Sequence, residues 1–276
     1  MAASLQLIKF KINVLNDKRK NNSSPIICVV GKRNTGKSEI IKNIMYHNRD
    51  IPSGIIISPT EQGNSFYSSF CPSLFIHYTY DTIILKNILD RQKKLIKKNG
   101  HHPKYDFFVI LDDCMFNKTE INKDINLRQF FMNGRHFQIF LIMSVQYIMD
   151  LSVTLRTNID FVFAMKENNI QNIERLYNSF FGIFSSKQLF IQAFNQITEN
   201  YGCIVLDNLS RSNNITETVY WYRSPYPHID FKVGNKKIWK LHNKYYDANK
   251  EFENDSSVIK NNNNTSTTNI MLLKNN

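Results

Sequence analysis

Short apolar runs alternate along the chain with longer segments in which apolar residues recur at helical spacing. Continuous apolar runs of this length are typical of strands that are buried on both faces, as in parallel sheets. The predicted strands are residues 25–30, 54–58, 75–80, 107–111, 139–145, 160–165 and 203–207. The predicted helices include residues 37–48, 81–98 and 125–132, and Asp81 is suited to cap the second of these. The pattern predicts an α/β fold with a mostly parallel central sheet and helices on both faces.

The two ends of the chain depart from this pattern. Residues 5–13 alternate between apolar and polar and predict a further strand, while residues 216–223 predict an edge or antiparallel strand near the C-terminus. From about residue 250 the sequence becomes polar and rich in Asn, which is typical of disorder. We therefore expect one domain over residues 1–248, whose first 24 residues form an N-terminal strand extension, and a low-complexity tail over residues 249–276.

Length and charge limit the number of domains and the kinds of partner that we expect for this chain. The 276 residues correspond to one large domain or two small ones, and 42% hydrophobic residues exclude a wholly disordered chain. The net charge of +12 favours a polyanionic partner, either nucleic acid or an acidic membrane surface. Since no apolar run approaches the ~20 residues of a spanning helix, we expect no membrane span, and basic residues near the start argue against a secretory signal.

The spacing of the four cysteines indicates the redox state of the compartment. They are scattered without a CxxC pair, and Cys28, Cys114 and Cys203 lie in or beside apolar runs. We interpret them as reduced core thiols of a cytosol-like compartment, because a disulfide frame or a zinc site would need paired spacing.

The segment GKRNTGKS at residues 31–38 matches the phosphate-loop pattern GxxxxGK[ST] at every position. Its context fits as well, because a predicted buried strand enters the loop and an amphipathic helix leaves it. In such a loop, backbone N–H groups surround the β-phosphate, Lys37 reaches the β/γ oxygens, and the Ser38 hydroxyl ligates Mg²⁺. The predicted nucleotide-binding residues are Gly31, Lys32, Arg33, Asn34, Thr35, Gly36, Lys37, Ser38 and Glu39.

A pair of acids supplies the second element that an ATPase needs. The apolar run 107–111 ends in Asp112 and Asp113, which is the form of a Walker B segment. We predict that Asp112 holds Mg²⁺ through water and that Asp113 polarises the attacking water. Asp113 is shorter than the Glu that is common at this position. Two predicted strands between the phosphate loop and Asp112 suit P-loop proteins with an additional strand between the two Walker strands.

Further candidate catalytic residues follow the two acids in the sequence. The predicted strand 139–145 ends in Gln146, whose amide can donate and accept and so suits contact with the γ-phosphate or its water. Arg135 and Arg156 each precede a predicted strand and are candidate arginine fingers, which would stabilise charge on the γ-phosphate of a neighbouring subunit. For either arginine alone, a solvated or structural ion pair is the alternative interpretation.

Together, the segments GKRNTGKS, VILDDC, NGRHFQIFLIMSVQ and LRTNIDFVF give the chain a family resemblance. It resembles the genome-packaging ATPases of nucleocytoplasmic large DNA viruses, in the FtsK–HerA branch of P-loop ATPases, over roughly residues 26–223. The strongest marks are the Gly-Arg-His turn before a strand that ends in Gln, and the Arg-x-Asn-x-Asp segment at 156–160.

The resemblance implies a ring-forming motor that hydrolyses ATP with Mg²⁺ and moves double-stranded DNA into a capsid. It also implies a capsid or portal component as partner, and action in the host-cell cytoplasm, at the viral factory, and in the virion. By the same analogy, an arginine from the neighbouring subunit completes the ATP site, which the resemblance assigns to Lys37, Ser38, Asp112, Asp113 and Gln146.

Two basic segments are candidates for sequence-independent DNA contact, with solvated surface as the alternative interpretation of each. One is residues 232–250, where lysines alternate with Trp239, Tyr245 and Tyr246. The other is the predicted helix that carries Lys86, Arg91, Lys93, Lys94, Lys97 and Lys98.

Three other functions stay open. A HerA-like translocase or helicase in replication or repair would use the same chemistry. A P-loop small-molecule kinase would need an Arg-rich lid over the phosphates. The segment at residues 166–199 contains a single arginine, Arg175, so no such lid is evident there. A non-catalytic nucleotide-binding scaffold is disfavoured because Lys37 and both acids are present.

Overall fold

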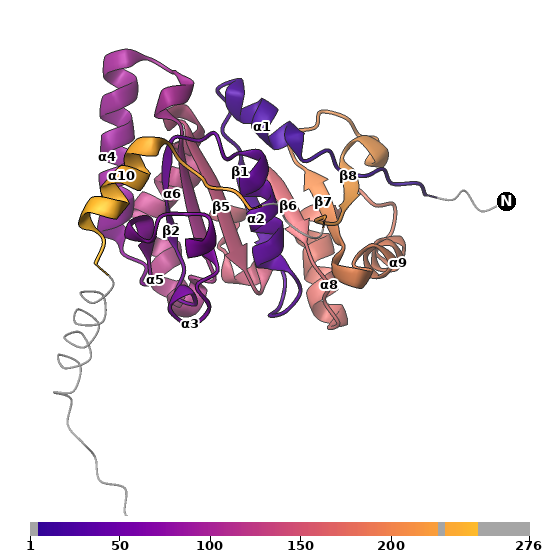
Figure 1. Cartoon of the computed structure of the whole chain (residues 1–276). Coiled ribbons are helices and arrows are strands. Elements are labelled where there is room, and N and C mark those ends of the chain that lie inside the picture. Colours follow the sequence, from indigo (N-terminus) through magenta and orange to yellow (C-terminus); the bar gives the residue numbers. More distant parts are fainter. Residues whose placement is uncertain (1–4, 226–229, 248–276) are drawn as a thin grey trace, which may run out of the picture.

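A computed structural model of the chain describes residues 5–225 and 230–247. Its centre is an eight-stranded sheet with the order β3-β2-β4-β5-β1-β6-β7-β8 (Figure 1). The strands β1 to β6 pair in parallel, whereas β7 is antiparallel to β6 and β8 is antiparallel to β7. The predicted mostly parallel sheet with antiparallel strands toward the C-terminus is thus confirmed. The strands are β1 Ile26–Val30, β2 Ser53–Ile57, β3 Ile76–His77, β4 Phe107–Asp112, β5 Ile139–Val145, β6 Phe161–Ala164, β7 Cys203–Asp207 and β8 Val219–Tyr222.

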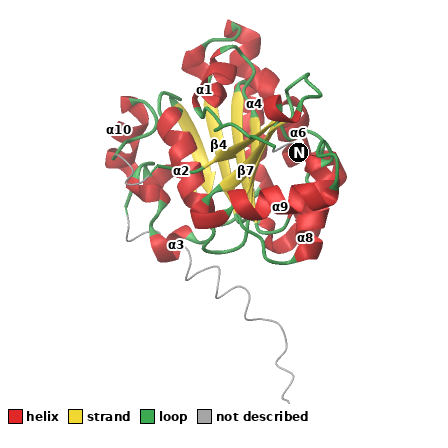
Figure 2. Ribbon diagram, turned by 90° about the vertical axis from the view of Figure 1, so that its right-hand side faces the viewer, coloured by secondary structure: helices red, strands yellow, loops and turns green. Residues whose placement is uncertain are grey.

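Helices cover both faces of the sheet, which gives the predicted three layers (Figure 2). Side chains alternate along each strand, so Ile27 and Val29 of β1 join the core beneath α1 and α2, while Cys28 joins the core beneath α4, α6, α8 and α9. The helices are α1 Asn13–Lys20, α2 Lys37–His47, α3 Glu61–Asn64, α4 Thr82–Asn99, α5 Lys118–Lys123, α6 Ile125–Asn133, α7 Val153–Arg156, α8 Ile170–Leu176, α9 Lys187–Ile197 and α10 Lys236–Tyr245. Asp81 caps α4 as predicted, because its carboxylate accepts the N–H of Ile83 at 2.7 Å.

The N-terminal segment differs from its prediction. Residues 5–13 do not form a strand, and Lys9 alone makes an isolated bridge to Trp221. Two backbone hydrogen bonds join this segment to β8: the Phe10 N–H donates to the carbonyl oxygen of Trp221 at 2.9 Å, and the Trp221 N–H donates to that of Ile8 at 3.1 Å. The helix α1 follows from residue 13 and buries Leu15 and Arg19, which recur at helical spacing. The predicted strand extension of residues 1–24 is therefore wrong for its described part.

The predicted strand at 75–80 is shorter than expected, since only Ile76–His77 pairs with β2. The chain leaves the edge of the sheet there, and the Tyr80 hydroxyl donates to the carboxylate of Asp124 at 2.6 Å. At the other end, the predicted tail at 249–276 lies outside the described residues.

All four cysteines are buried and free of disulfides. Burial raises the pKa of the Cys28 thiol to about 12 and raises the pKa of the thiols of Cys71, Cys114 and Cys203 as well. They pack as small apolar groups. Over the described ranges, no helix is both long enough and apolar enough to cross a membrane.

A buried arginine anchors α1 to the sheet. Arg19 is 2% exposed, and its guanidinium donates to Asp50 at 2.7 Å, to the side-chain oxygen of Asn48 at 3.3 Å, and to Asp106. Asp106 directly precedes β4 and also accepts the side-chain amide of Gln138 at 2.6 Å. Burial raises the pKa of Asp106 and the Arg19 charge opposes that shift. One cation thus joins α1, the end of α2 and the start of β4.

Replacing Arg19 by Met should lower the free energy of unfolding by about 3 kcal/mol or more, because Asp106 would remain buried without its cation. Urea denaturation measures this change. The matched control is Lys20→Met, since the Lys20 side chain is 54% exposed and lies 3.6 Å from Asp50. The control should cost less than about 1 kcal/mol, and equal losses in the two variants would contradict a buried anchor.

Candidate nucleotide-binding site

The site lies at the edge of the sheet where its parallel strands end. Strand β5 lies between β1 and β4, with Val30 paired to Val145 and Asp112 paired to Ser144. The predicted additional strand between the two Walker strands is therefore confirmed, and its identity is β5. In open α/β sheets, ligands bind outside the carboxyl ends of the strands. The loop after β1 and the residues after β4 and β5 meet at this edge.

The loop between β1 and α2 has the shape of a phosphate cradle. The carbonyl oxygen of Lys32 turns inward and accepts the Thr35 hydroxyl at 2.8 Å and the Lys37 ammonium at 3.1 Å. Gly36 has φ = 94°, a left-handed conformation that glycine adopts without a steric penalty, and α2 begins at the next residue. The N–H groups of the first turn of α2 have no partner within the helix and are oriented to receive an anion.

Lys37 places a cation between the loop and two carboxylates. It is only 9% exposed, and burial lowers the pKa of its ammonium. The negative charges of Asp113 and Asp112 oppose that shift, so both acids lie within electrostatic reach of the ammonium. The structure thus brings together the cation and the two acids that the sequence predicts.

Strand β5 holds both acids through Ser144. The Ser144 hydroxyl donates to the Asp112 carboxylate and accepts the backbone N–H of Asp113 at 3.0 Å. The side-chain amide of Gln146 donates to the Asp113 carboxylate at 2.6 Å. Asp113 has φ = 53°, which costs a residue other than glycine about 1–2 kcal/mol. The hydrogen bonds to Ser144 of β5 and to Gln146, which follows β5, maintain this strained conformation.

Tyr67 is a neighbour of Asp112 that the sequence patterns do not single out. The side chain is 1% exposed, and burial together with the Asp112 charge raises the pKa of its hydroxyl. Among the described residues the hydroxyl has no hydrogen bond of good geometry. The buried Glu61 carboxylate fixes the backbone here, because it accepts the N–H of Tyr67 at 2.8 Å and of Ser68 at 2.7 Å. Tyr67 thus places a hydroxyl donor beside Asp112.

Glu167 supports the loop from the other side of β1. It follows β6, is 7% exposed, and accepts the Lys32 ammonium at 2.7 Å. Its carboxylate also accepts the N–H of Asn169 at 2.8 Å and the side-chain amide of Asn172 at 2.9 Å.

Some of these supporting residues could be found from the sequence. Ser144 stands out there as a polar residue inside an apolar strand. A role for Glu167 becomes visible only once β6 is known to adjoin β1.

The two candidate arginines do not join this site within one chain. Arg135 lies in the 3₁₀ turn Gly134–Phe137 before β5, while Gln146 follows β5, so a strand of roughly 20 Å separates them. Arg156 ends α7, and its guanidinium contacts the sulfur of Met149 at 3.0 Å. Both stay predictions, and only a neighbouring subunit could bring either of them to a γ-phosphate.

The basic segments are surface features. On α4, the exposed cations are Lys86, Arg91, Lys94, Lys97 and Lys98, while Lys93 is half-buried and donates to Gln129 at 2.8 Å. On the C-terminal segment, the ammonium of Lys232 lies 4.6 Å from the ring centroid of Trp239. Residues 248–250 of that segment lie outside the described residues.

Comparison with known sequences gives a family and viral relatives. The sequence profile of the family described as "Poxvirus A32 protein" matches residues 8–209. Uncharacterized protein L437 of Acanthamoeba polyphaga mimivirus is 34% identical over 248 residues, which cover 88% of this chain and 84% of the relative. Uncharacterized protein 015R of Frog virus 3 is 32% identical over 245 residues, which cover 86% and 75%.

Comparison with solved structures supports the P-loop fold. The genome packaging NTPase B204 from Sulfolobus turreted icosahedral virus 2, in complex with AMPPCP, matches with a TM-score of 0.53 at 16% identity, covering 74% of this chain and 98% of that one. The monomer form of the pCW3 conjugation coupling protein TcpA with ATPgS matches with a TM-score of 0.55 at 12% identity, covering 87% and 75%.

Replacing Ser144 by Ala should lower the free energy of unfolding by about 2 kcal/mol, because the buried Asp112 carboxylate and the Asp113 N–H both lose a partner. Urea denaturation measures the loss. The matched control is Ser24→Ala, since Ser24 is 1% exposed and its hydroxyl has no partner among the described residues. That variant should be neutral or slightly stabilised. Equal effects would mean that Ser144 does not hold the two acids.

Proposed function

We propose that this chain, which belongs to the family of the poxvirus A32 protein, is an ATP-hydrolysing motor that translocates double-stranded DNA and packages a viral genome into its capsid. The observation that carries the proposal is the convergence of the phosphate loop, Asp112, Asp113 and Gln146 at one edge of the sheet. Family membership and the viral origin of the relatives support the packaging role.

The arrangement suits transfer of the γ-phosphoryl group to water. This reaction depends mainly on positioning and on electrostatic stabilisation of charge. Lys37 would leave the Lys32 carbonyl and bind the β/γ oxygens, where negative charge accumulates. Asp113 would accept the proton of the attacking water, and the hydrogen bond from Gln146 would fix the direction of its carboxylate. The N–H groups at the start of α2 would hold the phosphates.

The residues present also fit Mg²⁺, which prefers oxygen ligands and is bound in nucleotide sites by one or two protein groups together with phosphates and water. Asp112 is a buried carboxylate beside the Tyr67 hydroxyl, a donor able to bond an oxygen of the carboxylate or a metal-bound water. Ser38 lies in the first turn of α2. We propose that Ser38 and Asp112 hold the ion, which when bound neutralises charge on the phosphates.

DNA translocation, the ring, the capsid or portal partner and action in the infected cell belong to the proposal. A packaging motor must bind phosphates without regard to sequence, and the exposed cations of α4 suit such contacts. A subunit ring would let Arg135 or Arg156 reach the site of a neighbour. We further propose that residues 1–248 act as one ATPase domain.

Steady-state ATP hydrolysis should rise when linear double-stranded DNA is added to the purified chain. Lys37→Ala should abolish turnover, because charge on the β/γ oxygens would lose its cation. Asp113→Asn should lower turnover by at least 100-fold while ATP binding persists, because the base is lost. Release of phosphate and its dependence on DNA are the measurements.

Other outcomes would favour other functions. Phosphate transfer to a small molecule, without net phosphate release, would identify a kinase. ATP binding without any turnover would identify a scaffold or a motor that needs its capsid partner. Turnover that is indifferent to DNA would contradict a translocating motor.

Mixing of inactive variants should reveal an arginine that acts across subunits. If Arg156 is that residue, Arg156→Ala and Lys37→Ala proteins are each inactive alone. Their mixture should regain part of the activity, because some interfaces then combine an intact Lys37 with an intact Arg156. The same experiment with Arg135→Ala tests the other candidate. A mixture that stays as inactive as its components would exclude action in trans for that arginine.

A further inference from the structure

We infer that the pocket beside the phosphate loop binds the nucleobase and ribose of the nucleotide, with the Tyr201 ring as the surface on which a purine stacks. The inference rests on the proposed binding of ATP and names the part of the chain that would hold its nucleoside. It adds a specificity-determining residue, because a stacking surface distinguishes nucleotides by the size of their base.

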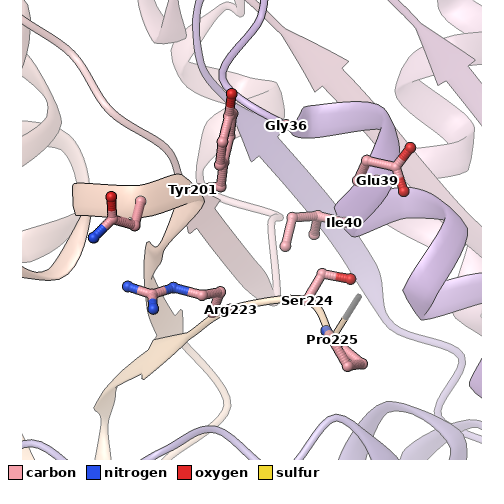
Figure 3. A pocket seen from close by; sticks show the side chains of 8 residues that line it. Gly36, Glu39, Ile40, Tyr201, Arg223, Ser224 and Pro225 are labelled. Atoms are coloured by element: carbon pink, nitrogen blue, oxygen red, sulfur yellow. The ribbon is translucent and has the colours of Figure 1, made fainter. Parts of the chain in front are cut away.

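The pocket has the volume and lining that a nucleoside needs. It encloses about 420 Å³, within the range of small-molecule sites. Figure 3 shows it between the start of α2, which contributes Gly36 and Ile40, and the segments that carry Tyr201 and Arg223. The Tyr201 ring adjoins the loop directly, since a Cβ placed on Gly36 would lie 3.5 Å from its Cδ1. An occupant of this pocket would therefore be in reach of phosphates held by the loop.

The topology places this pocket on the opposite side of the loop from the acids. Strand β5 and then β4 flank β1 on one side, and β6, β7 and β8 follow on the other. Tyr201 precedes β7 and Arg223 follows β8, and the pairing of Cys203 with Tyr222 brings both to the edge of the phosphate loop. A nucleotide with its γ-phosphate toward Asp113 would thus extend its nucleoside toward Tyr201.

The backbone holds Tyr201 in place at a conformational cost. Asn200 has φ = 50° and Tyr201 has φ = 61°, both left-handed, and bulky residues rarely adopt this conformation. The next residue must be glycine, because a Cβ at Gly202 would collide with the carbonyl oxygen of Ile197. The resulting turn leaves Tyr201 69% exposed on the pocket. Strain that exposes an aromatic ring beside a ligand loop indicates function in binding rather than in packing.

Arg223 and Ile40 complete the surface. The Arg223 guanidinium donates to the carbonyl oxygen of Glu199 at 3.1 Å, which ties it to the turn that carries Tyr201. Ile40 is 1% exposed and presents an apolar wall at the base of the pocket. Stacking on an aromatic ring together with contact to a guanidinium is how proteins hold bases without reading their edges. We therefore expect ATP and GTP to bind similarly and CTP to bind more weakly.

Calorimetry with the full chain tests this directly, using a non-hydrolysable ATP analogue and inorganic tripolyphosphate, each with Mg²⁺. Tyr201→Asn removes the ring but keeps a residue that tolerates the left-handed backbone. It should weaken binding of the analogue by at least five-fold and change tripolyphosphate binding by less than two-fold. Tyr201→Phe should keep both affinities within two-fold. The control Met132→Ala removes another exposed apolar side chain, on α6, and should change neither affinity.

Two results would overturn the inference while leaving the proposed ATP site intact. In one, Tyr201→Asn binds the analogue as tightly as the wild type. In the other, it loses affinity for the analogue and for tripolyphosphate equally, which would make Tyr201 a support of the phosphate loop. Failure of the wild type to bind either ligand would overturn the proposed ATP site together with this inference.

Discussion

The hydroxyl of Ser144 joins two strands at the point where they end. It donates to the Asp112 carboxylate and accepts the N–H of Asp113, so the two acids at the end of β4 take their positions from β5. This is possible only in the observed register, in which Asp112 faces Ser144. A shift of one residue would turn every side chain of β5 to the other face of the sheet. The left-handed backbone of Asp113 and its contact with Gln146 depend on the same register.

The phosphate loop is supported from both flanking strands of β1. On the β5 side, the N–H of Gly31 donates to the carbonyl oxygen of Val145 at 3.0 Å. On the β6 side, Glu167 pairs with Lys32, whose own carbonyl oxygen holds Lys37. The loop is therefore already shaped without a ligand, and under the proposed function binding would need only to transfer the Lys37 ammonium from a carbonyl to a phosphate oxygen. Such preorganisation reduces the cost of ordering the site when ligand binds.

Much of this fold could be predicted because its determinants are local. Apolar runs revealed the strands from β1 to β7, although β3 is shorter than its run, and the match to GxxxxGK[ST] located the loop with its strand and helix. The strand predicted over residues 5–13 was wrong because only residues 8–10 pair with β8, which is too short for a strand. The helix α1 follows this segment and is held by the burial of Arg19 against Asp106, a partner far along the chain.

The remaining site residues depend on contacts between distant segments, which no local pattern encodes. Glu167, Tyr67 and Tyr201 come from three separate connections and reach the loop or Asp112 only through the order of the strands. The strained turn at Tyr201 is equally invisible in sequence, since positive φ at a tyrosine contradicts its own preference. These departures from local rules occur at the edge where a nucleotide would bind, as expected when strain is maintained for function.

The roles predicted separately for Asp113 and Gln146 converge in one hydrogen bond of 2.6 Å. Asp is one methylene shorter than Glu, so its carboxylate reaches less far from the strand. The left-handed backbone and the Gln146 amide determine where that shorter side chain points. A glutamine amide has two N–H donors and one acceptor oxygen. Gln146 can therefore hold Asp113 with one N–H and offer its remaining groups to a phosphate or a water. Under the proposed reaction, loss of the γ-phosphate would change the partners of Gln146 and, through that shared amide, the alignment of the base itself.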